Sequence, residues 1–228
     1  MGINVKLLVQ QSVVLFVVFA LALFIPAGTL AWPAGWVYLF LLYGFVAALD
    51  WWMLKHNPGL LKERMGGIIQ AGQKGWDKLL MGSLQTLIVG WFILMALDAV
   101  RFHGSRMTVW IQVLGAIILL CSYYLFFTTF RENSYLSPVV RIQTDRGHKV
   151  VSTGPYHYVR HPMYTGIVLF SLGTPLLLGS WYGLVFALIL VSIMARRAVL
   201  EERTLRDELA GYTAYMTQVK YRFIPHVW

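Results

Sequence analysis

Charged residues are scarce in this sequence. Only 13% of its 228 residues are Asp, Glu, Lys or Arg, whereas 58% are hydrophobic. A soluble domain of ordinary composition carries about 25% charged residues, so the composition argues against a soluble globular fold. It predicts an integral membrane protein.

Cysteine and negative charge are also in short supply. The single cysteine, Cys121, cannot form an intramolecular disulfide, so no covalent cross-link supports the fold. Ten acidic residues are opposed by nineteen Lys and Arg residues, which gives a net charge of +9. Because the basic residues flank apolar runs and form no stripe with interleaved aromatic residues, we expect them to orient helices in a lipid bilayer and not to bind nucleic acid.

Six apolar runs divide the chain, and crossing a ~30 Å hydrocarbon core takes roughly 20 apolar residues. The runs are Val5–Ile25, Gly35–Leu54, Leu79–Val100, Thr108–Phe130, Met163–Leu178 and Trp181–Ala195. The first is longer than the apolar region of a signal peptide, so we expect it to be retained as a span. The last two are short and are separated by glycine and proline, which favours a tight hairpin. We therefore predict an all-α polytopic membrane protein with about six transmembrane helices, ending in a helical hairpin.

The basic residues are distributed unevenly between the two sides that six spans create. With the amino terminus inside, seventeen of the nineteen Lys and Arg residues fall on the cytoplasmic side, and only Arg101 and Arg106 fall outside. This is the bias of the positive-inside rule. We therefore expect both termini and a cofactor pocket on the cytoplasmic side, in the cell inner membrane if the chain is bacterial.

One membrane domain, residues 1–228, is the expected organisation. Residues 1–130 would supply four spans, and residues 131–228 a cofactor-binding segment, the hairpin and a C-terminal amphipathic helix. The connector Lys55–Lys78 is expected to hold a short helix around Leu60–Met65 and carries no recognisable chemistry. The terminal segment Tyr221–Pro225 has two interpretations, a lid that folds back or an interfacial tail.

The stretch His148–Gly166 gathers Gly, Pro, Tyr, His and Arg between apolar runs, which is unusual for a plain connector. Pro162 suits the first position of a helix, and the first turn of that helix would offer N–H groups and the positive end of its dipole to a carboxylate or phosphate. We therefore predict an active-site segment. No metal is expected, because Pro162 disfavours helical geometry at His161 and no carboxylate lies between Val150 and Arg160.

The order of motifs resembles the isoprenylcysteine carboxyl methyltransferase family and its bacterial and archaeal membrane relatives. The shared pattern, over roughly the last 100 residues, is His-x-Val-Val from His148, Gly-x-Tyr from Gly154, Arg-His-Pro-x-Tyr-x-Gly from Arg160, a hydrophobic hairpin, Glu201-Glu202 and a terminal Arg-Phe-x-Pro. The resemblance implies an S-adenosylmethionine-dependent methyltransferase that acts on a lipid-like or hydrophobic acceptor.

The resemblance also implies the residues of the site. Cofactor contacts are expected at Arg141, His148, Lys149, Val150, Val151, Tyr156, His161, Pro162, Met163, Tyr164 and Glu201. Gln143 is an alternative to Arg141, and Glu202 is added because either neighbouring carboxylate can accept hydrogen bonds from ribose hydroxyls or an ammonium group. The predicted catalytic residues are Arg197, Arg160 and His161, with Arg197 contacting the acceptor. An ion pair between Arg197 and Glu201 would stabilise a helix by only about 0.2–0.5 kcal/mol, which favours ligand contact for both.

Carboxyl O-methylation is the favoured reaction because a carboxylate is ionised at neutral pH and needs no general base. Phospholipid amines and thiols are alternative acceptors, for which His161 or His157 would remove a proton. An NADPH-dependent reductase similar to the sterol reductases is a further alternative, since these share the Arg-His-Pro-x-Tyr segment. Glu201 and Glu202 would be poor neighbours for its adenine 2′-phosphate. A transporter is disfavoured because the polar residues gather at one face and not in mid-span.

Overall fold

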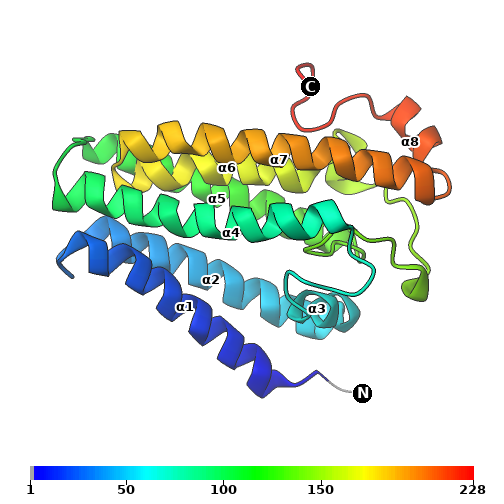
Figure 1. The fold of residues 1–228 in the computed structure, drawn as a ribbon, viewed down its shortest axis with the longest axis horizontal. Helices are drawn as coiled ribbons and strands as arrows, with labels where there is room; N and C mark the ends of the chain where they lie inside the picture. Colours follow the sequence, from blue (N-terminus) through cyan, green and yellow to red (C-terminus); the bar gives the residue numbers. More distant parts are fainter. Residues whose placement is uncertain (1–2) are drawn as a thin grey trace.

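The structure of the protein is a computed structural model that describes residues 3–228. Six long helices lie side by side in it. They are α1 (Val5–Ala27), α2 (Pro33–His56), α4 (Gly75–Ala96), α5 (Val109–Glu132), α6 (Pro162–Leu178) and α7 (Trp181–Glu208), shown in Figure 1. No β-strand occurs in the described range. The predicted all-α polytopic fold is confirmed. Five of the six helices are long and apolar enough to cross a membrane, whereas α6 is shorter, at 17 residues.

Short helical segments lie between or after the long helices. They are α3 (Pro58–Met65), the π-helical turn Leu97–Arg101 that extends α4, the 3-10 turns Thr144–Arg146 and Gly154–His157, and α8 (Tyr212–Gln218). Helix α3 begins where Asn57 caps the N–H of Leu60 and a proline occupies the first position. It confirms the short helix predicted in the first long connector.

Both chain ends lie at the same end of the helical layer, together with α3, α8 and the long connector between α5 and α6 (Figure 1). The opposite end carries the three short turns that join α1 to α2, α4 to α5 and α6 to α7. Gly179 has a φ of 84°, which favours glycine, and Ser180 accepts a hydrogen bond from the N–H of Gly183 to start α7. The predicted hairpin is therefore present, and the polar connectors share one end of the bundle.

Helices α5 and α6 approach each other closely because small residues face the contact. A Cβ atom on Gly115 would collide with the backbone of Leu177, and one on Gly173 would lie 2.8 Å from the carbonyl oxygen of Gly115. Ser122 donates a hydrogen bond to the Gly166 carbonyl across the same interface, at 2.8 Å. Small residues are the usual means of close helix packing in membranes. The contacts hold α6 against α5 along most of the length of α6.

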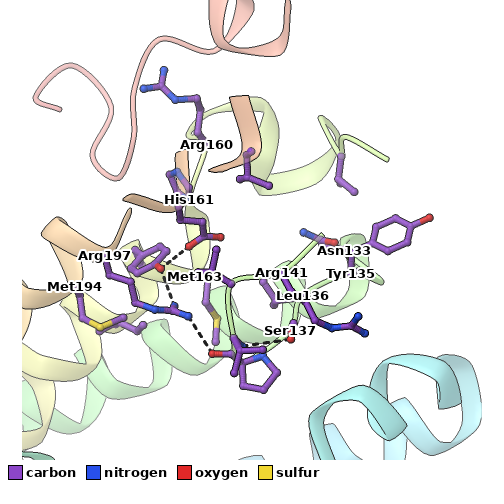
Figure 2. A pocket seen from close by; sticks show the side chains of 18 of the residues that line it. Asn133, Tyr135, Leu136, Ser137, Arg141, Arg160, His161, Met163, Met194 and Arg197 are labelled. Atoms are coloured by element: carbon purple, nitrogen blue, oxygen red, sulfur yellow. Dashed lines mark hydrogen bonds between the residues drawn. The ribbon is translucent and has the colours of Figure 1, made fainter. Parts of the chain in front are cut away.

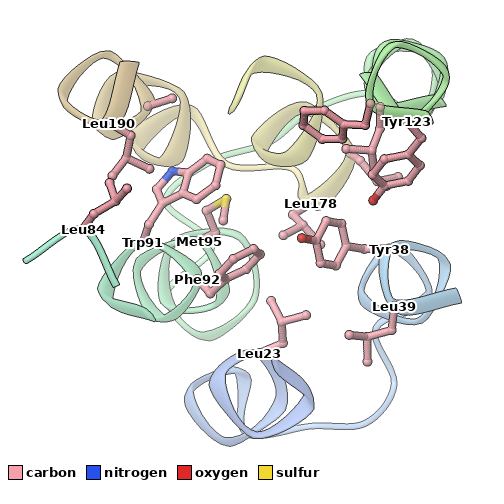
Figure 3. Packing of buried hydrophobic residues seen from close by; sticks show 14 of the residues in the cluster. Leu23, Tyr38, Leu39, Leu84, Trp91, Phe92, Met95, Tyr123, Leu178 and Leu190 are labelled. Atoms are coloured by element: carbon pink, nitrogen blue, oxygen red, sulfur yellow. The ribbon is translucent and has the colours of Figure 1, made fainter. Parts of the chain in front are cut away.

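The buried apolar core lies between α1, α2, α4, α5, α6 and α7 (Figure 3). Its largest buried side chain is Trp91, whose indole Nε1–H donates a 2.7 Å hydrogen bond to the Gly183 carbonyl. Phe92 packs beside it against Tyr38, with ring centroids 5.4 Å apart. A buried tryptophan with its N–H satisfied is a stable anchor, so α4 and α7 are held together at this depth.

Helix α7 extends further than its apolar run. The run was expected to end at Ala195, but the helix continues to Glu208, for 28 residues or about 42 Å. Its last turns therefore stand among the polar connectors. Charged residues that follow the apolar run are thus carried on a rigid helix.

Candidate functional site

A cavity of about 400 Å³ opens at the end of the bundle where the connectors gather. Its polar end is bounded by the connector between α5 and α6 and by the last turns of α7. Figure 2 shows Arg197 and Met194 on one side of this space and Asn133 and Tyr135 on the other. Its apolar arm runs into the bundle between α4, α6 and α7, and is lined by Met81, Leu84, Ile88, Trp91, Ile167, Phe170, Leu190 and Met194.

Most of the predicted site residues meet in this cavity. Those that line it are Arg141, His148, Lys149, Val150, Val151, Tyr156, Arg160, His161, Met163, Tyr164, Arg197 and Glu201. Pro162, Gln143 and Glu202 are absent from the lining. The contact of each lining residue with a ligand stays a prediction, but segments more than 50 residues apart in sequence converge on one space.

Arg197 has a different partner from the one that the sequence suggested. Its Nε–H donates to Asp77 Oδ1 at 2.8 Å, and another of its N–H groups donates to the Tyr164 hydroxyl at 2.8 Å. That hydroxyl donates to Glu201 Oε2 at 2.5 Å. Arg197 and Glu201 are therefore linked through Tyr164, and they form no direct ion pair in the described residues.

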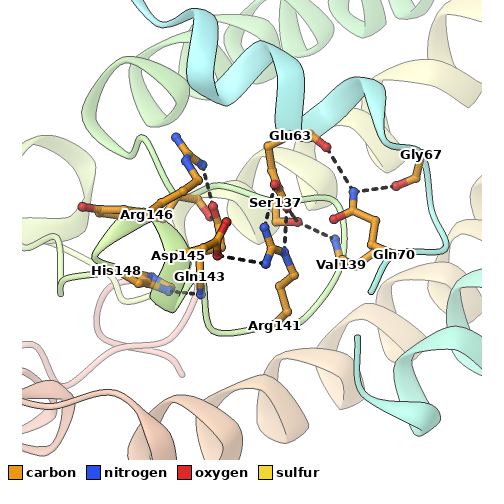
Figure 4. Close-up of polar contacts among 11 residues, drawn as sticks. Glu63, Gly67, Gln70, Ser137, Val139, Arg141, Gln143, Asp145, Arg146 and His148 are labelled. Carbon is orange, nitrogen blue, oxygen red and sulfur yellow. Dashed lines mark hydrogen bonds and ion pairs between the residues drawn. The ribbon is translucent and has the colours of Figure 1, made fainter. Parts of the chain in front are cut away.

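The first long connector, for which no role was expected, supplies two carboxylates that bind arginines of the cavity lining. Asp77 belongs to the first turn of α4 and is fully buried, and Glu63 of α3 binds Arg141 through both carboxylate oxygens, at 2.9 and 2.7 Å (Figure 4). The Arg141 hydrogen bonds lower the pKa of the Glu63 carboxyl. Both carboxylates lie far along the chain from their arginines, and no local pattern marks them. A carboxylate beside the start of an apolar run was the available signal.

Arg141, not Gln143, reaches the cavity. The Gln143 side chain is fully buried and is occupied by the Tyr135 carbonyl, to which it donates at 2.6 Å, and by Arg146, from which it accepts. The Arg141 guanidinium is itself committed to Glu63, and to Asp145 at 3.3 Å. Arg141 therefore fixes a wall of the cavity.

Glu202 does not face the cavity, which corrects its predicted role as a cofactor contact. It is 4% exposed, and its two oxygens accept hydrogen bonds from Arg160 at 2.5 Å and from Arg222 at 2.7 Å. His161 Nε2 lies 3.4 Å from the same carboxylate. Successive helix residues point about 100° apart, so Glu201 and Glu202 cannot share one ligand. Glu202 binds the carboxyl-terminal segment to the site.

The carboxyl-terminal segment folds back over the start of α6. The N–H groups of Arg160 and His161 donate to the carbonyls of Tyr221 and Arg222, each at 2.9 Å. The Phe223 ring is buried and stacks on Tyr164, with centroids 5.3 Å apart. Of the two interpretations of this segment, the folded-back one is therefore present. The N–H groups that it occupies precede the first turn of α6.

Two sets of polar groups on the cavity wall have no protein partner within residues 3–228. The hydroxyl of Tyr212 is buried without a hydrogen bond, and the backbone N–H groups of Lys149, Val150 and Val151 make none. Buried polar groups are normally satisfied, so the Tyr212 hydroxyl is suited to a polar ligand, and the N–H groups of the exposed or half-buried residues 149–151 are open to one as well. His148 stacks on Tyr135, and burial together with the charge of Arg146 lowers the pKa of its imidazole, so it is neutral at pH 7.

These features define a polytopic helical membrane protein with a mixed polar and apolar cavity at one end of its bundle, and the comparisons agree. A phospholipid methyltransferase family model matches residues 110–210. Protein-S-isoprenylcysteine O-methyltransferase of Schizosaccharomyces pombe is 29% identical over 141 residues, 59% of this chain and 60% of that protein. The enzyme of the same name from Saccharomyces cerevisiae is 30% identical over 125 residues, 54% of this chain and 52% of that protein.

A solved structure shares the fold. The eukaryotic intramembrane Ras methyltransferase ICMT superposes with a TM-score of 0.56 at 20% identity, over 96% of this chain and 86% of that chain. In sequence the chain is thus similar to protein-S-isoprenylcysteine O-methyltransferases, and in fold to the solved ICMT structure, in agreement with the resemblance that its motif order indicated. It spans little more than half the length of the curated relatives it matches.

Replacing Glu202 should release the carboxyl-terminal segment. Glu202→Gln leaves the buried Arg160 without its charge partner, which costs about 3–5 kcal/mol when a buried pair is broken. We expect a lower unfolding temperature in detergent and faster amide hydrogen exchange over residues 219–228. Glu208→Gln is the matched control, because its pair with Lys74 is solvent-exposed and contributes about 0–1 kcal/mol. Equal behaviour of the two variants would contradict this role of Glu202.

Proposed function

We propose that this chain is an S-adenosylmethionine-dependent methyltransferase that methylates the carboxyl group of a membrane-partitioned acceptor. One observation carries the proposal: a single cavity joins a polar end, where Arg197 and Glu201 meet through Tyr164, to an apolar arm between α4, α6 and α7. A soluble cofactor and a lipid-like acceptor could thus meet in one space. The names of the relatives support the same chemistry.

The polar end fits the cofactor. Glu201 is the one carboxylate in the described lining and can accept from ribose hydroxyls or an ammonium group. The free N–H groups of residues 149–151 and the Tyr212 hydroxyl can satisfy further polar atoms of a nucleoside and an amino acid. When bound, S-adenosylmethionine supplies a methyl group on a positively charged sulfonium.

The protein's contribution to transfer is to bind, orient and exclude water. The apolar arm would hold a hydrocarbon chain, and Arg197 at its polar limit would hold the acceptor carboxylate. An ionised carboxylate needs no general base, so no proton has to move before transfer. His161 and Arg160 then support the wall together with Glu202, and need not take a proton.

A second candidate is a phospholipid amine acceptor, favoured by the description of the matching family model. An ammonium group must lose a proton before it can act as a nucleophile, and the buried His161 would be the candidate base. The cavity argues for the anion, because Arg197 in its lining is hydrogen-bonded through only three of its five N–H donors in the described residues. A reductase is less supported, because Arg141, Arg160 and Arg197 are already paired and leave few cations for a 2′-phosphate.

We also propose that the cavity end of the bundle is cytoplasmic, because seventeen of nineteen basic residues belong to that end. Reporter fusions should place a tag after Ser180 outside the cell membrane and a tag at the carboxyl terminus inside. The two sites lie at opposite ends of α7, so opposite results are required. Two tags on the same side would refute the arrangement.

Calorimetric titration with S-adenosylhomocysteine tests the cofactor directly. The wild type should bind it and should not bind NADPH. Glu201→Gln should weaken binding by about 1.5–3 kcal/mol, the range for a hydrogen bond to a charged group. Glu208→Gln, an acidic residue of the same helix outside the cavity, should bind like the wild type. NADPH binding in place of S-adenosylhomocysteine would favour the reductase.

Filling the apolar arm tests the acceptor. Leu84→Trp adds bulk inside the arm and should lower kcat/KM for an isoprenylcysteine acceptor by about tenfold or more, since overpacking a filled site costs about 1–3 kcal/mol. The affinity of this variant for S-adenosylhomocysteine should equal that of the wild type. Leu79→Trp is the matched control, because Leu79 is 76% exposed on the same helix. Vesicles containing phosphatidylethanolamine are offered to the enzyme in a parallel assay. Methylation of this lipid and not of the isoprenylcysteine would show that the acceptor is an amine.

A further inference from the structure

Asp77 is a fully buried carboxylate that lies behind the cavity wall. It is 0% exposed, belongs to the first turn of α4 and does not line the cavity. Oδ1 accepts from Arg197 Nε at 2.8 Å, and Oδ2 accepts from Gln73 Nε2 and from the Val140 N–H, each at 2.9 Å. A buried carboxylate with three donors is a well-satisfied anion, and its charge faces only one cation, Arg197.

The Arg197 guanidinium is held at three points and retains free donors. Asp77 takes the Nε–H, Tyr164 takes one N–H, and the Pro138 carbonyl takes another at 3.1 Å. A guanidinium has five N–H donors, so two remain in a residue that lines the cavity. Because the group is planar and rigid, fixing three donors fixes the direction of the other two.

We propose that Asp77 is a positioning residue for methyl transfer: it holds Arg197 so that the two free N–H donors meet the anionic group of the acceptor. This inference rests on the proposed function and adds to it a residue that never contacts the acceptor. Without Asp77 the guanidinium would be a buried cation without a charge partner, and its direction would no longer be fixed. The acceptor would then lose its orientation.

Asparagine cannot replace Asp77 in this arrangement. Both oxygens face donors, so the amide NH₂ of asparagine would oppose either the Arg197 Nε–H or the donors of Gln73 and Val140. The side chain has nearly the same size and shape, and the change is therefore one of hydrogen bonding and charge. Gln73→Ala is the matched control, because it removes a donor from Asp77 and leaves the bond to Arg197 in place.

The experiment measures methyl transfer to an isoprenylcysteine acceptor and, separately, S-adenosylhomocysteine binding by calorimetry, on full-length protein. Asp77→Asn should lower kcat by about 10- to 100-fold, the loss expected from a misplaced reacting group, and raise the acceptor KM. Cofactor affinity should stay within about threefold, because Asp77 does not line the cavity and its hydrogen-bond donors are Arg197, Gln73 and Val140, none of them a proposed cofactor contact. Gln73→Ala should lower kcat less than Asp77→Asn does, because Asp77 keeps its charge, its bond to Arg197 and its bond from the Val140 N–H.

A double variant separates positioning from general damage. If Asp77 acts through Arg197, then Asp77→Asn combined with Arg197→Gln should be no slower than Arg197→Gln alone. Wild-type kcat and KM in Asp77→Asn, or multiplicative losses in the double variant, would overturn the inference. A parallel loss of cofactor affinity would also overturn it, because that is the result of a collapsed wall.

Two further outcomes are decisive. If Asp77→Asn does not fold, Asp77→Glu keeps the charge and both acceptor oxygens but shifts the carboxylate by one methylene. It should bind S-adenosylhomocysteine normally and turn over slowly, and full turnover would overturn the inference. If the wild type itself neither binds S-adenosylhomocysteine nor methylates an isoprenylcysteine, the proposed function fails first, and the role of Asp77 fails with it.

Discussion

Helix α7 continues for about three and a half turns past its apolar run, and the arrangement of the site depends on this extension. The apolar part anchors the helix in the bundle through contacts such as Trp91 with Gly183. The charged part is then held at a fixed height among connectors that have little core of their own. Side chains on a rigid helix keep their relative directions, so one helix can supply a wall of the cavity and a binding surface for the carboxyl-terminal segment.

Buried charge then determines how the connectors are arranged. An ionised side chain removed from water needs a partner, and here the partners come from segments distant in sequence. Arg197 is paired with Asp77 from the first long connector, and Glu202 with Arg160 and Arg222. Each pair therefore fixes a segment distant in sequence to α7 as well as neutralising a charge. These ionic and backbone contacts act beside a second buried apolar cluster, in which Leu209, Tyr212, Tyr215 and Val219 pack with Ile142 and Val150 of the connector between α5 and α6.

The sequence was sufficient for features that depend on local pattern. Apolar runs predicted the long helices, glycine and proline predicted the hairpin at Gly179, and the unusual polarity of residues 148–166 marked one wall of the cavity. The sequence was insufficient where the role of a residue depends on a partner that is distant along the chain. Asp77 and Glu63 were missed because their arginines lie far away along the chain, and Glu202 was assigned to the ligand because adjacency in sequence does not tell which face a carboxylate occupies.

Arg197 lies at the boundary between the apolar and the polar part of the cavity face of α7. Residues before it on the cavity face, Leu190 and Met194, are apolar, and the next one after it, Glu201, is a carboxylate. An acceptor with a hydrocarbon chain can bury that chain in the apolar arm. Its charged group would stay at the level of Arg197, the first charged residue along this face of α7, because burying a charge deeper among apolar side chains costs free energy. A cofactor with a cationic centre is favoured on the other side of the same boundary, near Glu201. The Arg197 guanidinium therefore lies where the two ligands would meet. The buried Asp77 carboxylate behind it stabilises the positive charge at this position.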